Sequence, residues 1–184
     1  MRELSLHILD LMQNSIEAGA TRVSLLIEED PDGDWMIIRI TDDGRGMSEE
    51  MVAKVTDPFV TTRTTRKVGL GIPLFDAAAR QTGGDFSIRS VLGEGTVVEA
   101  RFGYAHIDRA PLGDIVGTVI TFLAGNPNLE LDYLHKFKER TFTFQTEEIR
   151  RALDDVAINH PMIIGWIQDY LKSGLAEIYG GEIE

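Results

Sequence analysis

The sequence contains no cysteine, which excludes disulfides, thiolate metal sites and redox thiols. It also lacks a long apolar run, because its most hydrophobic stretch, Ile115 to Ala124, is too short to cross a bilayer. Basic residues are few, with 18 Lys and Arg against 30 Asp and Glu and a net charge of -12. Nucleic-acid-binding surfaces need basic side chains to neutralise phosphates. We therefore expect neither a nucleic-acid nor a membrane partner.

No targeting segment is expected either. Met1-Arg2-Glu3 is followed by an amphipathic stretch and not by the apolar core of a signal peptide, so a soluble cytoplasmic protein is the default. The chain has 184 residues, of which 43% are hydrophobic. That is enough for one buried core, or for one domain with a smaller appendage.

Hydrophobic periodicity predicts an α/β first part and a distinct second part. The elements expected in the first part are a helix over 3–18, strands over 21–29 and 36–41, a short helix after Ser48, a helix from 71 to 83, and strands over 85–91 and 96–102. Those expected in the second part are a helix over 112–123, a hairpin with strands near 129–133 and 142–144, and helices over 146–158 and 161–179. We place the domain boundary near residue 105, which gives regions 1–104 and 105–184.

The helix over 3–18 carries polar residues on one side, because positions four and seven apart share a face. Its segment HILDLMQNSIEAGATRV resembles the N-box of the GHKL ATPase superfamily, in the version of MutL and gyrase. The resemblance implies that the side-chain oxygen of Asn14 binds Mg²⁺, a hard cation that prefers oxygen ligands. Asp10 matches the position of the glutamate that activates water in those ATPases. The alternative is a polar helix face that binds nothing.

The loop DDGRGM ends the second strand and resembles the first glycine box of the superfamily. There the carboxylate matched by Asp42 accepts a hydrogen bond from the adenine amine, which would discriminate against the oxo group of guanine. Gly44 and Gly46 let the backbone approach the base, and Met47 completes the box. The alternative is an ordinary Asp- and Gly-rich turn after a strand.

The segment DPFVTTRTTRKVGLGIPL resembles the F-box and second glycine box of histidine kinases. The resemblance implies that Phe59 packs under a lid and that backbone N–H groups at a helix start bind phosphate. The alternative for the lid cations is a solvated basic loop. The nucleotide-binding candidates in this segment are Thr61, Thr62, Arg63, Arg66, Lys67, Gly69, Leu70 and Gly71.

The stretch GEGTVVEARF resembles the third glycine box. In that box, the threonine matched by Thr96 supports the adenine-binding aspartate, often through a shared water. The alternative is a Gly-rich hairpin without a ligand.

These motifs occur in the superfamily's order within residues 1–103. They imply a two-layer α/β sandwich of Bergerat type with a mixed sheet, a small C-terminal α+β extension, and ATP or ADP with Mg²⁺ as cofactors. The N-box is MutL-like, whereas the lid and the following glycine box are histidine-kinase-like. We lean towards a protein kinase that phosphorylates His or Ser on a separate partner, because the sequence shows no upstream phosphoacceptor helix. A slow ATPase switch and a non-enzymatic ATP/ADP sensor remain open.

Residues 105–184 carry no recognised motif, so they are expected to contact a protein partner, to form a homodimer or to extend the sheet. The histidines are not expected to act as ligands. His7 is expected at the surface or against the lid, and His106, His135 and His160 lack metal-ligand spacing.

Overall fold

The structure is a computed structural model that describes residues 3–56, 71–153 and 156–181. The helices and strands follow the order expected from the sequence. In the first part they are α1 (Leu4–Glu17), β1 (Arg22–Asp30), β2 (Trp35–Asp42), α2 (Glu49–Thr56), α3 (Gly71–Gln81), β3 (Asp85–Val91) and β4 (Gly95–Gly103). In the second part they are α4 (Ile115–Gly125), β5 (Glu130–Phe137), β6 (Arg140–Gln145), α5 (Thr146–Ala152) and α6 (Pro161–Ile178).

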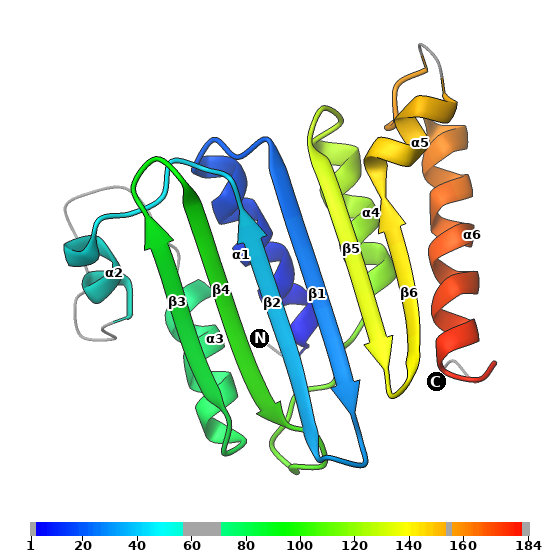
Figure 1. Ribbon diagram of the computed structural model, residues 1–184. Coiled ribbons are helices and arrows are strands. Elements are labelled where there is room, and N and C mark those ends of the chain that lie inside the picture. The colour runs from blue at the N-terminus through cyan, green and yellow to red at the C-terminus, as the bar shows by residue number, and fades with distance from the viewer. Residues whose placement is uncertain (1–2, 57–70, 154–155, 182–184) are drawn as a thin grey trace.

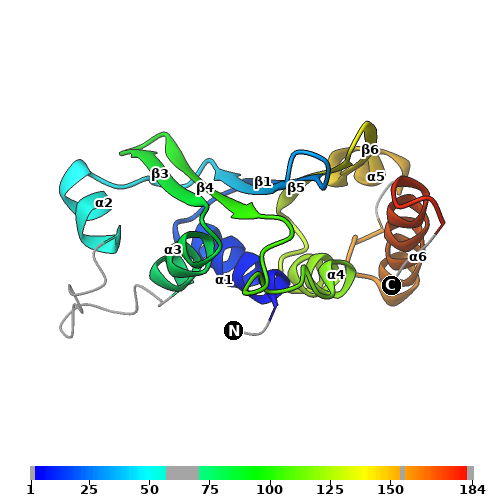
Figure 2. The same ribbon diagram turned by 90° about the horizontal axis from the view of Figure 1, so that it is seen from below.

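The strands form one mixed sheet in the order β3-β4-β2-β1-β5-β6 (Figure 1). β1 and β5 are parallel, and the other neighbouring pairs are antiparallel. Helices α1, α3 and α4 cover one face of this sheet, as Figure 2 shows from below. The arrangement confirms the expected two-layer sandwich with a mixed sheet.

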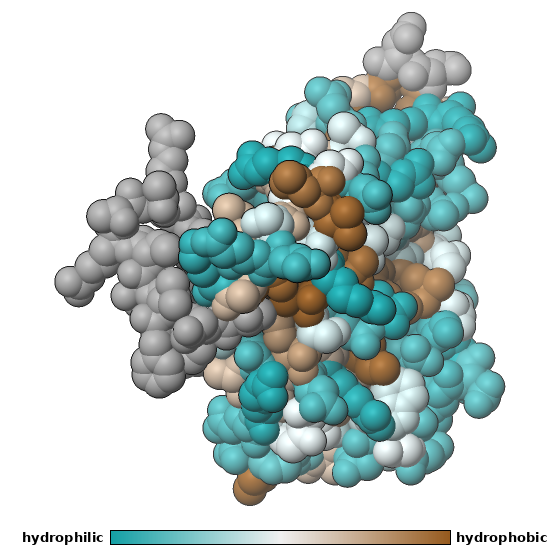
Figure 3. Space-filling model, turned by 60° about the vertical axis from the view of Figure 1, so that its left-hand side comes forward, coloured by the Kyte–Doolittle hydropathy of each residue, from teal (hydrophilic) through white to brown (hydrophobic). Residues whose placement is uncertain are grey.

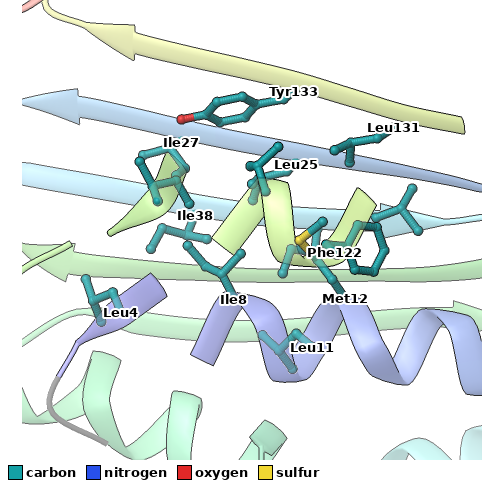
Figure 4. Close-up of a cluster of buried hydrophobic side chains, with 14 of the residues drawn as sticks. Leu4, Ile8, Leu11, Met12, Leu25, Ile27, Ile38, Phe122, Leu131 and Tyr133 are labelled. Carbon is teal, nitrogen blue, oxygen red and sulfur yellow. The ribbon is translucent and has the colours of Figure 1, made fainter. Parts of the chain in front are cut away.

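The core lies between the sheet and the covering helices. In β1 the side chains alternate between buried and partly exposed, with Val23, Leu25 and Ile27 turned inward. They meet one side of α1, where Leu4, Ile8, Leu11 and Met12 are at most 2% exposed (Figure 4). Each such side chain contributes about 1.5–3 kcal/mol to folding. This packing holds α1 firmly along the sheet.

The second part shares this core. Phe122 of α4, with Leu131 and Tyr133 of β5, lies in the same cluster as the α1 residues (Figure 4). The N–H groups of Leu4 and Ser5 also donate to the carbonyls just before α4, at 2.9 and 2.8 Å. Of the roles considered for residues 105–184, the structure shows an extension of the sheet. A separate role in protein contact stays a prediction.

Two expected helices have different ends. α4 begins at Ile115 and not near Leu112, because the Asp114 side chain caps it by accepting from the Gly117 N–H at 2.7 Å. The Leu112 carbonyl is used instead by the start of α1. α5 ends at Ala152, although helix was expected to residue 158. Ile158 lies in a turn and not in a helix, and it is 1% exposed. The turn therefore buries its side chain.

The expectation of a surface position for His7 is wrong. Its side chain is 3% exposed, and its ring lies 5.7 Å from that of Phe75 on α3. In the described part of the chain, no helix combines the length and apolar character needed to cross a membrane.

Candidate functional site

β2 ends and β4 begins at the same end of the sheet (Figure 1). Polar side chains meet at this end. Asp42, the last residue of β2, is in register with Thr96 of β4. Thr96 is in turn in register with Ser90 of β3. Ser15, near the end of α1, reaches the same place from the helical layer. The first and third glycine-box sequences are therefore brought together with the N-box helix.

The Asp42 carboxylate is half-buried and held from both sides. The buried Ser15 hydroxyl donates to its Oδ2 at 2.8 Å, and the Gly44 N–H donates to its Oδ1 at 2.9 Å. An ionised carboxylate can accept about four hydrogen bonds, so these contacts leave it able to accept more. The arrangement fixes the carboxylate in place at the edge of the sheet.

The glycines near Asp42 are needed for packing of the chain on itself. Gly46 has φ +63°, and a Cβ there would overlap the Val91 carbonyl. Gly95 has φ +122°, and a Cβ there would overlap the Asp42 carbonyl. These positive φ values favour glycine. We expected the glycines of the first box to admit the base, and the structure adds that they let the loop approach the β3–β4 hairpin.

Ser90 links three parts of the site. Its Oγ accepts from the Met47 N–H at 2.8 Å, donates to the Gly95 carbonyl at 2.9 Å and lies 2.8 Å from the Thr96 hydroxyl. Thr96 was expected to support Asp42, and its partner in the structure is Ser90. A serine in a strand has no distinctive sequence pattern, which is why Ser90 was not among the expected site residues.

Asp43 joins the loop after β2 to the start of β1. Its carboxylate accepts from the Thr21 N–H at 2.7 Å, the Thr21 hydroxyl at 2.6 Å and the Arg22 N–H at 2.8 Å. Burial alone would raise the pKa of Asp43, but these hydrogen bonds outweigh it and hold the pKa below its usual value. Asp43 thus fixes the position of the turn after α1 relative to Asp42. Neither Asp43 nor Ser15 was identified from the sequence.

A hollow of about 670 Å³ opens beside these groups. It is lined by Asp42, Ser90 and Thr96 from the sheet and by Val52 from α2, with their neighbours. Pockets that bind small molecules have volumes of about 300–1,000 Å³. On the face that carries α2, polar surface surrounds a short apolar strip (Figure 3). The hollow is large enough for a nucleotide base.

The expected phosphate end lies where α1 meets the start of α3. A Cβ at Gly71 would sit 3.0 Å from Oδ2 of Asp10, so the exposed Asp10 carboxylate faces the first residue of α3. Burial lowers the pKa of His7, one turn before Asp10, and the Asp10 charge offsets this only in part. The pairing places a candidate base beside a helix N-terminus, which favours phosphate.

Asn14 lies one turn after Asp10 and is half-buried. Within the described residues its side-chain amide has no hydrogen-bond partner, so its oxygen can act as a ligand. No group of three His, Cys, Asp or Glu side chains suited to a metal occurs in the described ranges. An amide oxygen of this kind would suit Mg²⁺, which usually takes one or two protein oxygens and completes its shell with phosphate and water. Asn14 would hold the ion, which would neutralise phosphate charge.

Several expected site residues lie outside the described residues, and their roles stay predictions. They are Phe59, Thr61, Thr62, Arg63, Arg66, Lys67, Gly69 and Leu70. Of the second glycine box, the structure describes Gly71.

A half-buried Asp beside a base-sized hollow, an amide on the covering helix and a glycine at a helix start define a nucleotide-binding α/β sandwich. Comparison with known families agrees with this class. Residues 2–106 match the family described as "Histidine kinase-, DNA gyrase B-, and HSP90-like ATPase". The match covers more than half of the chain, and the protein belongs to this family. Family membership implies that it binds ATP or ADP.

Its curated relatives include proteins named as sensors and sensor histidine kinases. The chain is 30% identical over 118 residues to the "Non-motile and phage-resistance protein" of Caulobacter vibrioides, covering 59% of this chain and 14% of that protein. It is 30% identical over 91 residues to "Sensor histidine kinase ZraS" of Salmonella typhi, covering 49% of this chain and 19% of that one. The chain thus spans under a fifth of the length of these relatives.

Solved structures show the same fold. The Aquifex aeolicus MutL ATPase domain complexed with ADP matches with a TM-score of 0.51 and 15% identity, over 100% of this chain and 71% of that one. The N-terminal domain of a DNA repair protein matches with a TM-score of 0.56 and 10% identity, over 78% of this chain and 52% of that one.

Proposed function

We propose that this protein is an ATP-binding signalling protein that transfers the γ-phosphoryl group to a separate protein. The observation that carries the nucleotide site is the Asp42 carboxylate. Ser15 and Gly44 hold it at the edge of the hollow, where it can still accept a hydrogen bond. Asn14 and Asp10 lie on the helix that supplies Ser15, so one rigid element would position base, metal and γ-phosphate. Phosphoryl transfer is catalysed largely by such positioning and by charge neutralisation.

The preference for a kinase rests on the relatives. Several are named sensor histidine kinases, and their matches cover about half of this chain. A His or Ser on another protein would be the acceptor.

The second candidate is a slow ATPase, and the position of the Asp10 carboxylate, which faces Gly71, favours it. A carboxylate there could take a proton from an attacking water. Asp is one methylene shorter than Glu, so the carboxylate would lie about 1 Å farther from that water. A displacement of this size can cost about a hundredfold in rate. A protein that binds ATP without turnover would be a sensor, the third candidate.

One experiment separates the three candidates. The protein is incubated with ATP labelled at the γ-phosphate and with extract of its source cells, and the label is followed. Label on a second protein supports the kinase, free phosphate supports the ATPase, and unchanged ATP supports the sensor. The Asp42→Asn variant is the control, because transfer that continues unchanged in it would not come from this site.

Asp10 is tested by single-turnover phosphate release. If Asp10 is the base, Asp10→Asn should lower the rate and Asp10→Glu should raise it, with little change in ATP affinity. Equal rates in Asp10→Asn and the parent would leave Asp10 as a solvated helix residue.

For protein contact we propose the exposed side of α6. Met162, Trp166 and Tyr170 recur there every fourth residue and are 77%, 51% and 43% exposed. The Trp166 and Tyr170 rings stack with centroids 5.4 Å apart. Self-association through this side would make light scattering depend on protein concentration, and Trp166→Ala should reduce that dependence. A monomer at every concentration, with and without nucleotide, would exclude the homodimer.

A further inference from the structure

The hydrogen bonds of the Ser90 hydroxyl determine the direction in which the neighbouring Thr96 hydroxyl points its hydrogen. A serine hydroxyl has one hydrogen to donate and two lone pairs to accept with. The Met47 N–H can only donate to Ser90, and the Gly95 carbonyl can only accept from it. The third partner, the Thr96 hydroxyl at 2.8 Å, could take either role.

One arrangement makes all three hydrogen bonds at once. Ser90 gives its hydrogen to Gly95, accepts from Met47 with one lone pair and accepts from Thr96 with the other. Any arrangement in which Ser90 donates to Thr96 leaves the Gly95 carbonyl without this donor. The hydrogen of Thr96 is then committed to Ser90, and only the lone pairs of Thr96 remain for a ligand.

Thr96 lies in register beside Asp42, whose carboxylate is also an acceptor. The hydrogens of Ser15 and Gly44 point at Asp42 and are therefore not offered to the hollow. The edge of the hollow formed by Asp42 and Thr96 thus presents acceptors. Adenine offers an exocyclic amine with two hydrogens at its six-position, whereas guanine offers an oxo acceptor there. Two acceptors facing an oxo group would leave all of them unpaired, which disfavours guanine.

We propose that Ser90 is a specificity-determining residue, which orients the Thr96 hydroxyl so that the site accepts adenine nucleotides and rejects guanine nucleotides. Ser90 acts through Thr96 and is a positioning residue. The inference rests on the proposed nucleotide site and adds to it the origin of base selectivity. Without Ser90, the Thr96 hydroxyl is free to rotate and to donate to the guanine oxo group.

The test is calorimetric titration of the parent, Ser90→Ala, Ser90→Thr and Ser87→Ala with Mg-ATP and Mg-GTP. Ser87 is an exposed serine on the same strand and is the matched control. The ratio of GTP to ATP dissociation constants should fall about tenfold in Ser90→Ala, as one hydrogen bond would produce. It should stay at the parent value in Ser87→Ala, and Ser90→Thr should restore it because the hydroxyl is kept.

An unchanged ratio in Ser90→Ala overturns the inference, and so does an equal loss of affinity for both nucleotides, which would indicate a purely structural role. Should Ser90→Ala fail to fold, Thr96→Val takes its place. It removes the oriented acceptor, so a ratio that stays at the parent value in Thr96→Val also overturns the inference. A parent that binds neither nucleotide overturns the proposed function itself. A parent that prefers ATP, with variants that keep this preference, overturns only the role of Ser90.

Discussion

The two ends of the sheet each hold a cluster of hydrogen-bonded polar side chains. The clusters differ in whether their carboxylate can still accept a hydrogen bond from a ligand. The cluster at the Asp42 end consists of Ser15, Asp42, Ser90 and Thr96 beside an open hollow. The cluster at the far end consists of Glu29, Tyr133, His135 and Tyr179, and its members join β1, β5 and the end of α6. Each contains a carboxylate held by a hydroxyl.

The far-end cluster is closed. Glu29 is 5% exposed and His135 is fully buried. His135 Nε2 lies 2.8 Å from Glu29, and the Tyr133 hydroxyl lies 2.6 Å from His135 Nδ1. Because Glu29 can only accept when ionised, the Nε2–H group of His135 donates to it. Burial raises the pKa of both tyrosines, which keeps their hydroxyls protonated as donors, and Tyr179 donates to Glu29.

The comparison separates the carboxylate that we propose for binding from a structural one. Asp42 is half-buried, faces a hollow and retains acceptor capacity, whereas Glu29 is enclosed by partners that the fold itself supplies. Loss of Glu29 should therefore affect stability, and loss of Asp42 should affect binding.

The largest effect is expected at the far end. The Glu29 carboxylate is the shared hydrogen-bond partner of His135 and Tyr179. Glu29→Ala removes it, so both side chains lose this acceptor in the protein interior. Leaving a buried donor without its partner costs about 1–3 kcal/mol for each such group. For a chain of this size, each kcal/mol lowers the melting temperature by roughly 2–4 °C. Thermal and urea unfolding of the parent and the variant measure the change.

The neighbouring Glu28 provides the control for this prediction. It lies on the same strand and forms a partly exposed ion pair with Lys136 at 3.8 Å. Pairs of this kind contribute about 0–1 kcal/mol. If Glu28→Ala destabilised the protein as much as Glu29→Ala does, the far-end cluster would have no special structural role.

The next effect is expected at Asp42. Asp42→Asn replaces an acceptor oxygen by an amide that cannot fully serve the adenine amine, so ADP affinity should fall by roughly tenfold or more. The unfolding free energy should change far less than in Glu29→Ala, because the carboxylate faces the hollow. Calorimetric titration with ADP, paired with urea unfolding, tests both parts. Equal ADP affinity in variant and parent would exclude Asp42 from the base pocket.

A smaller effect is expected at Asn14. Asn14→Ala removes the amide oxygen assigned to Mg²⁺ and leaves the core side of α1 intact, so the variant should fold normally. ADP affinity measured with and without Mg²⁺ should differ in the parent and become equal in Asn14→Ala. Gln13→Ala, at the exposed neighbouring position, serves as the control. A variant that still gains affinity with Mg²⁺ as the parent does would show that the ion has other ligands.

The sequence predicts the local parts of this picture well. The order of helices and strands follows from periodicity, since the side chains of β1 and α1 face the core at the spacing of a strand and a helix. Asp42 and the glycines were found because their short motifs are compact in sequence. The positive φ of Gly46 and Gly95 gives those motifs a packing reason that does not depend on a ligand.

What the sequence does not predict is long-range pairing. Glu29 and His135 are 106 positions apart, and neither carries a local signal for the other. The same limit applies to the pairing of β1 with β5, which makes residues 105–184 part of the main sheet. Ser15 and Ser90 were missed for a related reason, because serine is common and only its partners distinguish it.

The last prediction concerns the stability of the protein at low pH, which depends on the charge of Glu29. Burial alone would raise the pKa of Glu29, but hydrogen bonds from His135 and Tyr179, with the charges of His135 and Arg109, outweigh it and lower the pKa. The unfolded pKa of Glu is about 4.3. A lowered folded pKa means that the ionised form stabilises the fold above the unfolded pKa, and that this stabilisation is lost as pH falls through the folded pKa.

The difference in unfolding free energy between parent and Glu29→Gln should therefore be constant near neutral pH and shrink once the pH falls below about 4.3. Urea unfolding at a series of pH values measures it. A difference that stays the same down to the acid end would mean that folding does not lower the pKa of Glu29, and that its charge adds nothing to the stability of the far-end cluster.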